Sequence, residues 1–113
     1  MGYLKKINAK RKRWLWLKHF GSKAYRTMVV DMDCLVSRCA RRPIDPHHWP
    51  TTGSGRGTYR DLTPLCSGLD GHHTEFHSTG QATFQAKYGL DLKAAAEKIY
   101  RAGRHLVEKT NAQ

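Results

Sequence analysis

The chain has 113 residues, which is enough for one domain with a modest hydrophobic core. It carries 20 Lys and Arg against 9 Asp and Glu, a formal net charge of +11, which favours a nucleic-acid partner over a merely solvated basic surface. Three cysteines exclude a fully paired disulfide framework, and no signal peptide or long apolar run is seen, so we expect a reduced, cytoplasmic protein with no membrane partner.

Residues 1–25 are strongly basic and contain no acidic residue. Their apolar side chains fall near helical spacing, which predicts a short amphipathic helix over about 8–20 that ends at Gly21. One interpretation is an arm that grips phosphate groups, with an affinity that falls steeply with salt. The alternative is a solvated tail that packs Trp14 or Trp16 on the domain. The residues of this arm expected to bind nucleic acid are Lys10, Arg11, Lys12 and Arg13.

Three short segments have the character of strands. Residues 25–30 alternate weakly and include two valines, which predicts a short strand. Residues 44–49 fit a strand or an extended segment, in which Pro46 suits only a sheet edge or a bulge. Residues 62–66 predict a second short strand.

A glycine-rich stretch, residues 51–57, connects the last two of these segments. It lacks both the Lys-Ser/Thr ending of a P-loop and the spacing of a dinucleotide fingerprint, so we reject a nucleotide pocket there. We interpret it as a flexible connection that leaves Arg56 and Arg60 available to phosphate groups.

The last part of the chain is predicted to be helical. Helical spacing begins at about His72, and Gly80 is expected to end or bend that helix. Asp91 is a candidate N-cap for an alanine-rich helix that we interpret as scaffold. The expected buried stripe of this last helix consists of Leu92, Ala95, Ala96, Ile99 and Leu106.

The three cysteines and one histidine have the pattern of a structural zinc site. Four residues separate Cys34 from Cys39, a knuckle-like spacing, and His72 follows Cys66 by six positions. Together they could form a closed, tetrahedral Cys3His site that supplies folding energy to a small core. The alternative is three free thiols in an intracellular core.

The remaining histidines of this region suggest a second, different metal site. Adjacent residues on a helix point about 100° apart, so His72 and His73 cannot face the same ion, whereas His73 and His77 share a face. In an extended segment His47 and His48 point to opposite faces, so one can join the helix pair while the other is held close by. Three protein ligands leave a position open for water or phosphate, which marks a catalytic centre, and the spare histidine suits a general base.

Three segments together resemble a known family. They are Asp45-Pro46-His47-His48-Trp49, Asp61-Leu62-Thr63-Pro64-Leu65-Cys66 and His73-Thr74-Glu75-Phe76-His77. The tandem histidines, the Leu-Cys pair and the His-x-x-x-His spacing are similar to HNH, or ββα-metal, endonucleases. More narrowly, they resemble small phage and prophage nucleases related to the recombination-enhancement nuclease Ref. The resemblance covers roughly residues 34–90, about half of the chain.

The resemblance implies an α+β fold with a small ββα-metal core, in which two antiparallel strands and a helix surround one metal ion, and a zinc knuckle. Residues 26–110 would then form the nuclease domain, with residues 1–25 as a basic N-terminal arm or helix and a scaffold helix at the C-terminal end. A phage-encoded protein of this kind would work in the host cytoplasm.

The same resemblance implies roles for individual residues. His48 matches the general base, and His47, His73 and His77 match the ligands of the catalytic metal. Asp61 stands where the family usually has an asparagine that braces the loop and the base; we expect it to orient and electrostatically support His48. A second departure is the knuckle, where His72 takes the place of a fourth cysteine.

The implied activity is hydrolysis of DNA phosphodiester bonds with one divalent ion, Mg, Mn, Ni or Zn, that leaves 5′-phosphate and 3′-hydroxyl ends. The expected partner is DNA, with RNA not excluded and a phage or host protein as a further partner. The main alternative is a zinc-stabilised nucleic-acid-binding module without catalysis. A basic ribosome- or RNA-associated structural protein would explain the charge but not the paired histidines.

Overall fold

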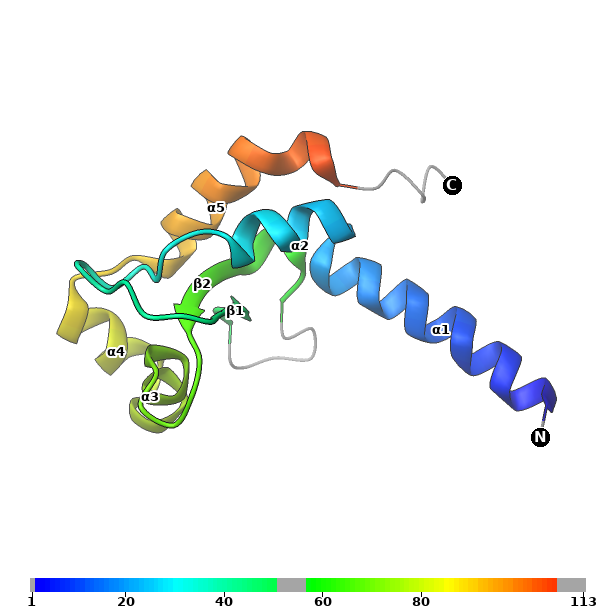
Figure 1. Ribbon diagram of the computed structural model, residues 1–113, viewed down its shortest axis with the longest axis horizontal. Coiled ribbons are helices and arrows are strands. Elements are labelled where there is room, and N and C mark those ends of the chain that lie inside the picture. Colours follow the sequence, from blue (N-terminus) through cyan, green and yellow to red (C-terminus); the bar gives the residue numbers. More distant parts are fainter. Residues whose placement is uncertain (1, 51–56, 108–113) are drawn as a thin grey trace.

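Two short antiparallel strands lie at the centre of the molecule, with helices packed around them (Figure 1). The computed structural model describes residues 2–50 and 57–107. This is the α+β class expected from the sequence. The elements, in chain order, are α1 (Gly2–Phe20), α2 (Lys23–Val30), β1 (Ile44–His48), the 3-10 turn η1 (Tyr59–Asp61), β2 (Leu62–Cys66), α3 (His72–Thr79), α4 (Gln81–Tyr88), α5 (Leu92–Gly103) and the 3-10 turn η2 (Arg104–Leu106).

The two predicted strands around the glycine-rich stretch are confirmed and pair with each other. Ile44 lies opposite Cys66 and His48 lies opposite Leu62 at the two ends of the ladder. All five residues of β2 are buried, because α2, α3 and α5 all contact this strand while β1 pairs along its edge. Pro46 sits in β1 as an edge residue, since each strand of a two-stranded sheet has one free edge.

The predicted strand over residues 25–30 is wrong, because this segment is the helix α2. Ser22 caps its start by accepting a hydrogen bond from the Tyr25 N–H at 2.9 Å. Tyr25 and Val29, one helical turn apart, are both fully buried. The Arg42 guanidinium donates hydrogen bonds to the backbone carbonyls at the C-terminal end of α2. Capping and burial at helical spacing therefore outweigh the weak strand preference of the two valines.

The basic N-terminal segment forms α1, which begins earlier than predicted and ends at Gly21 as expected. Gly21 has a φ of +79°, and a Cβ there would lie 3.1 Å from the Tyr59 ring, so glycine suits this bend. The helix projects away from the rest of the molecule and touches α2 and η1 near its C-terminal end (Figure 1). Trp14 is 59% exposed, so it does not pack on the domain, whereas Trp16, 37% exposed, contacts the Phe20 ring.

The C-terminal helix α5 is capped and buried largely as predicted. The Asp91 side chain accepts a hydrogen bond from the Ala94 N–H at 3.0 Å. Three positions of the expected stripe are buried, Leu92, Ala96 and Ile99, while the remaining two are half-buried. None of the helices in the described part of the chain is long and apolar enough to cross a membrane.

Gly80, with a φ of +91°, ends α3, and α4 follows at once as a separate helix that was not predicted. The Glu75 carboxylate on α3 accepts hydrogen bonds from Lys87 and Tyr88 on α4, which holds the two short helices together. The predicted Arg56, most of the glycine-rich stretch and the predicted domain end at residue 110 lie outside the described residues.

We predict that Ser22→Ala lowers the free energy of unfolding by about 1–2 kcal/mol. The Ser22 hydroxyl caps α2 and also donates to the Leu106 carbonyl at 2.6 Å, so one substitution removes both contacts. Denaturant unfolding measures the loss. Ser78→Ala, at an exposed position of α3, is the control and should change stability by less than about 0.5 kcal/mol. Equal losses in the two variants would contradict the role of the cap.

Candidate metal centres

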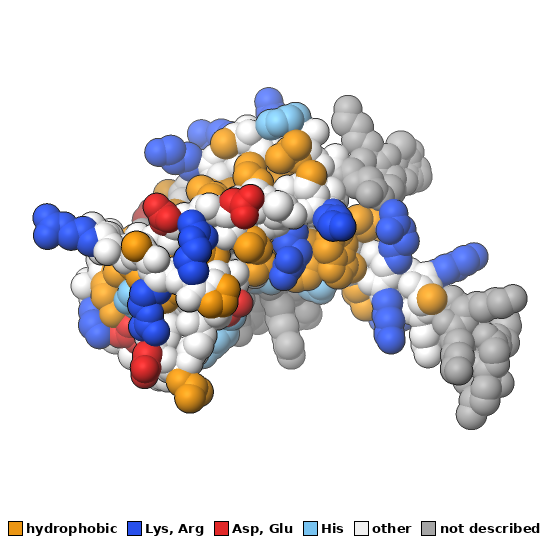
Figure 2. Space-filling view, viewed as in Figure 1, with side chains coloured by type: hydrophobic (Ala, Val, Ile, Leu, Met, Phe, Trp, Pro, Cys, Tyr) orange, Lys and Arg blue, Asp and Glu red, His pale blue; other side chains and the backbone are white. Residues whose placement is uncertain are grey.

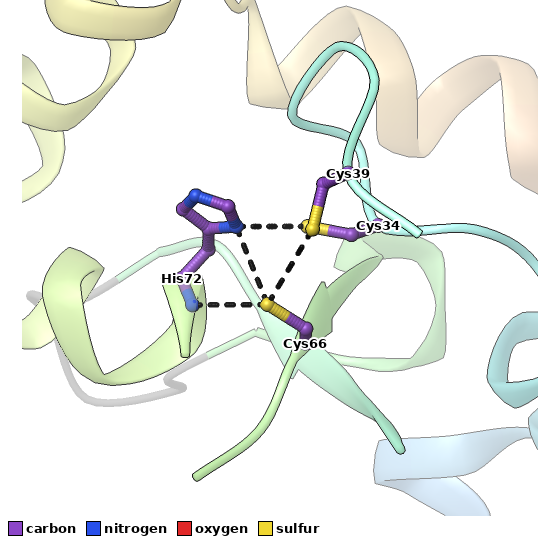
Figure 3. Close-up of side chains that lie close together, drawn as sticks. All are labelled: Cys34, Cys39, Cys66 and His72. Carbon is purple, nitrogen blue, oxygen red and sulfur yellow. Dashed lines mark hydrogen bonds between the residues drawn. The ribbon is translucent and has the colours of Figure 1, made fainter. Parts of the chain in front are cut away.

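The three cysteines and His72 converge in the structure, as the zinc prediction requires (Figure 3). Cys34 and Cys39 come from the segment between α2 and β1, Cys66 ends β2, and His72 begins α3. The His72 Nδ1 atom lies 3.4 Å from the Cys34 Sγ and 3.3 Å from the Cys66 Sγ, and the Sγ atoms of Cys39 and Cys66 are 3.8 Å apart. We call these four residues the Cys3His cluster.

The spacing of the Cys3His cluster fits a tetrahedral zinc ion. With zinc–sulfur and zinc–nitrogen bonds of about 2.3 and 2.0–2.1 Å, the edges of the tetrahedron are about 3.5–3.8 Å long. All three cysteines are free thiols, and Cys34 and Cys66 are buried. The His72 backbone N–H also donates to the Cys66 Sγ at 3.2 Å, a hydrogen bond typical of the surroundings of a metal-bound thiolate. The donor set and its surroundings therefore suit a structural zinc site.

Gly71 makes the close approach of α3 to β2 possible. A Cβ at this position would lie 2.4 Å from the Ser67 carbonyl oxygen and 2.5 Å from that of Cys66, which no side chain tolerates. Because Gly71 is the N-cap of α3, the turn can bring His72 directly onto the Cys66 sulfur.

Burial also sets the protonation of the Cys3His cluster. It raises the pKa of the Cys34 thiol to about 11 and lowers the pKa of His72. The imidazole is therefore neutral near pH 7, with a lone pair to offer, whereas the Cys34 thiol has to lose its proton when it binds a metal.

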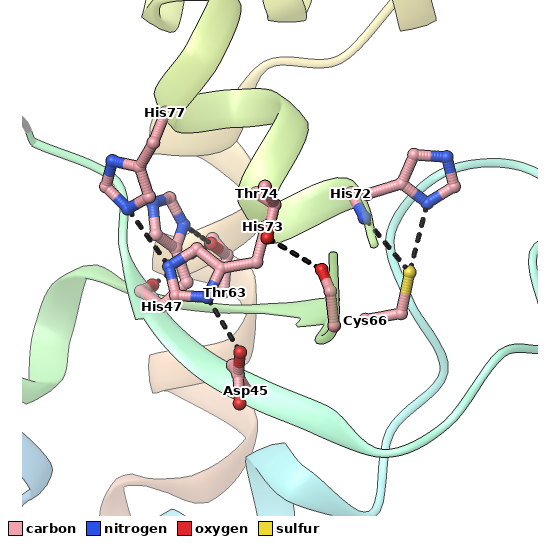
Figure 4. A network of polar contacts seen from close by, with 9 residues as sticks. Asp45, His47, Thr63, Cys66, His72, His73, Thr74 and His77 are labelled. Atoms are coloured by element: carbon pink, nitrogen blue, oxygen red, sulfur yellow. Dashed lines mark hydrogen bonds and ion pairs between the residues drawn. The ribbon is translucent and has the colours of Figure 1, made fainter. Parts of the chain in front are cut away.

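A second cluster is formed by His47 from β1 and by His73 and His77 from α3 (Figure 4). One ring nitrogen from each histidine lies within 4.8 Å of the others. The pairing of His73 with His77 on one helical face and the separation of His72 from them are as the sequence predicts. We call this set the three-histidine cluster.

His47 is the most deeply buried member, at 3% exposed, and its tautomer follows from its neighbours. The single hydroxyl hydrogen of Thr63 is donated to the His47 carbonyl at 3.1 Å, so the same oxygen accepts from His47 Nδ1–H at 3.2 Å. The His47 Nε2 atom consequently carries a lone pair. It is buried and has no hydrogen-bond partner among the described residues.

His73 is oriented by a carboxylate on β1. Its Nδ1–H donates to Asp45 Oδ2 at 2.8 Å, which in the neutral ring leaves the lone pair on Nε2, 3.1 Å from the His77 Nε2. A carboxylate that fixes the far nitrogen of a ligating histidine is a common support for a metal site. Asp45 was not predicted as a site residue, although its position two residues before His47 places both on one face of the strand.

Burial keeps the rings of His47 and His77 neutral, so their nitrogen lone pairs are available to a metal ion. Burial, together with the nearby His73 and His77, lowers the pKa of His47 to about 3, and burial lowers that of His77 as well. His77 is exposed and His73 half-buried, so one side of the cluster opens to solvent. Neutral imidazoles around an open position can hold a divalent transition metal and leave room for water or a phosphate oxygen.

His48 points to the other side of β1, as the alternation of a strand requires. Its Nε2–H donates to the His19 carbonyl at the end of α1 at 2.8 Å, and its ring packs against the rings of His19 and Phe20. Burial lowers the pKa of His48, so the ring is neutral near pH 7 and its Nδ1 carries the lone pair. The contacts of His48 are thus with α1 rather than with the three-histidine cluster.

The remaining predicted residues occupy separate places. The Asp61 carboxylate accepts from the Thr58 N–H at 2.8 Å in a capping box, and its negative charge works to raise the pKa of His48 without a hydrogen bond between them. Arg60 is exposed and its guanidinium lies 4.3 Å from the centre of the Tyr100 ring. Lys and Arg side chains are spread along α1 and over the visible face (Figure 2), and those exposed on α1 include the predicted Lys10, Arg11, Lys12 and Arg13.

Comparisons with family models, with characterised proteins and with solved structures find no match to this chain. The structure itself has two antiparallel strands followed by a helix, together with a Cys3His cluster, an arrangement compatible with a ββα-metal core.

We predict that the protein binds one zinc ion at the Cys3His cluster and that Cys34→Ser abolishes this binding. The expected consequence is a clear fall in the midpoint of thermal unfolding, because a structural metal contributes to folding. Elemental analysis and thermal unfolding measure the two effects. His77→Ala is the control, since it should leave this zinc in place. Full zinc content and unchanged stability in Cys34→Ser would contradict the assignment.

We also predict that Asp45→Asn weakens binding of a second divalent ion about 10–100-fold, because the carboxylate orients His73. Titration calorimetry of Co²⁺ or Ni²⁺ into zinc-loaded protein measures this affinity. The matched control is Asp33→Asn, which removes a carboxylate paired with Arg42 and should leave the affinity unchanged. Equal affinities in the two variants would show that Asp45 does not support the cluster.

Proposed function

We propose that this protein is a metal-dependent endonuclease of the HNH type that hydrolyses phosphodiester bonds in DNA. The observation that carries the proposal is the buried Nε2 of His47, which has no hydrogen-bond partner among the described residues. Burial of such an atom without a partner costs free energy, and coordination to a metal would remove that cost. The lone pair of the neighbouring His73 supports the same interpretation.

The two clusters differ in the number of donors they offer and in exposure, and this difference supports catalysis at the three-histidine cluster. The Cys3His cluster offers four donors and would be closed around its ion, whereas the three-histidine cluster offers three and is exposed on the His77 side. When bound there, a divalent ion supplies Lewis-acid stabilisation of negative charge on the scissile phosphate and its leaving oxygen. His47, His73 and His77 would hold it.

His48 is the proposed general base. Its Nε2–H is held by the His19 carbonyl, which leaves Nδ1 to take the proton of the attacking water. The charge of Asp61 would stabilise the imidazolium that forms. The exposed Lys and Arg residues of α1, with Arg60, would contact the nucleic-acid backbone without reading bases, so cleavage would be weakly sequence-specific unless a phage or host protein directs it.

The alternative is a zinc-stabilised nucleic-acid-binding module without catalysis. The Cys3His cluster and the exposed basic side chains of α1 are sufficient for it. This alternative requires neither the open three-histidine cluster nor a neutral His48 held by α1, and it predicts binding of nucleic acid with no cleavage.

The deciding experiment is plasmid cleavage by zinc-loaded protein from which loosely bound metal has been removed, with Mg²⁺, Mn²⁺, Ni²⁺ or Zn²⁺ added back, alongside an RNA substrate. We expect metal-dependent cleavage of DNA that His48→Ala reduces by about 10²–10⁴-fold, the usual contribution of a general base. His105→Ala, at an exposed position of η2, is the matched control and should cleave like the wild type.

Equal cleavage by His48→Ala and the wild type would remove His48 from the mechanism. Binding without cleavage under any of these metals would favour the non-catalytic module. Cleavage of RNA alone would keep the nuclease and change its substrate.

A further inference from the structure

A concave site lies between η1 and α5, and no residue of either metal cluster lines it. Its cavity has a volume of about 500 Å³, a size typical of small-molecule sites. It is lined by Trp49, Arg60 and Asp61 and by side chains of α5 and η2. We call this site the basic cleft.

The helix α5 contributes a complete face to the basic cleft. Lys93, Glu97, Tyr100, Arg101 and Arg104 recur at intervals of three and four residues, so they line one side of the helix and its continuation into η2. A different side of α5 carries the buried stripe that packs against β2 and α2. The helix α5, which the sequence predicts to be scaffold, therefore also forms one wall of the basic cleft.

The side chains that line the basic cleft carry a net positive charge. Four cations line it against two carboxylates. The Asp61 carboxylate is engaged in the capping box, and Glu97 lies 3.9 Å from Arg101 on the same helix. Among the described residues, 2–50 and 57–107, no carboxylate forms an ion pair with Arg60, Lys93 or Arg104. The cleft is thus suited to an anion.

The aromatic residues of the cleft have different roles. Arg60 is stacked over Tyr100, which fixes the guanidinium and leaves its N–H edge available to phosphate oxygens. Tyr59 packs on Tyr100 as well, with 6.0 Å between ring centres. Tyr100 is consequently covered by Arg60, and Trp49, half-buried against the core, is the other aromatic ring in the wall of the cleft.

Trp49 joins the basic cleft to the end of β1, where the proposed general base lies. It follows His48 directly in the chain, and the Cα atoms of consecutive residues are about 3.8 Å apart. The Trp49 N–H donates to the Asp61 carbonyl at 3.2 Å, which ties the end of β1 to the wall of the cleft. A nucleic-acid strand that passes the end of β1 would therefore meet this cleft.

We infer that the basic cleft binds one nucleotide of the nucleic-acid strand that flanks the scissile phosphate. Arg60, Lys93 and Arg104 would hold its phosphate group and Trp49 would stack on its base, a combination found in proteins that bind single strands. This inference rests on the proposed function, because it assigns the nucleotide to the strand being cleaved.

The test measures binding by the full chain, without cleavage. In a background of Trp14→Phe, Trp16→Phe and His48→Ala, Trp49 is the single tryptophan and reports on the cleft. We expect a short single-stranded oligodeoxynucleotide to quench Trp49 fluorescence saturably. Lys93→Gln should weaken this binding about 5–10-fold and reduce its salt slope by about one. Lys98→Gln, an exposed charge of the same helix outside the cleft, should change affinity less than about twofold.

Equal effects of Lys93→Gln and Lys98→Gln, or no change of Trp49 fluorescence at saturation, would overturn the inference. Deoxythymidine monophosphate and inorganic phosphate are the other arms of the titration. Binding of either as tightly as the oligonucleotide would make the cleft a site for a free phosphate compound and overturn its assignment to a strand. Failure of the nuclease proposal would appear separately, as absent metal-dependent cleavage with this binding intact.

Discussion

The antiparallel register of β1 and β2 is the constraint on which both metal clusters depend. It sets His47 opposite Thr63 and places Cys66 at the far end of the same ladder, opposite Ile44. Each strand therefore contributes a ligand to a different cluster, and the hydroxyl that selects the tautomer of His47 is positioned by the pairing itself. A slip of one residue would turn His47 away from α3 and exchange it for His48.

The helix α3 connects the two clusters through adjacent residues. His72 faces Cys66 while His73 faces His47, because neighbouring side chains on a helix diverge by about 100°. The Cys3His cluster thereby fixes where α3 begins and how it is rotated, and Phe76, fully buried beneath the His47 ring, holds the next turn. A metal ion that orders the Cys3His cluster would in this way also order the three-histidine cluster, because both depend on the position of α3.

Much of this arrangement could be predicted from residue spacing, and the parts that could not have identifiable causes. Ligand spacing and side-chain periodicity were sufficient to predict β1, β2 and α3. They were also sufficient to assign the histidines to two different metal clusters. They failed for α2, where a serine cap and burial of Tyr25 decide the conformation. The hydrogen bond between His48 and a backbone carbonyl of α1 could not be predicted from side-chain identity, because any residue at position 19 has that oxygen. The basic cleft likewise depends on how η1 meets α5, a tertiary contact.

The length of α1 has a consequence for the size of any duplex this protein could cover. Nineteen residues at a rise of about 1.5 Å make a rod roughly 28 Å long, and duplex DNA advances about 3.4 Å per base pair. The rod is therefore comparable to about eight base pairs, considerably more than the five-residue strands of the hairpin could span. If the protein binds a duplex as proposed, the length of this single exposed helix would govern the footprint, and the proposed chemistry would be confined to the hairpin at its base.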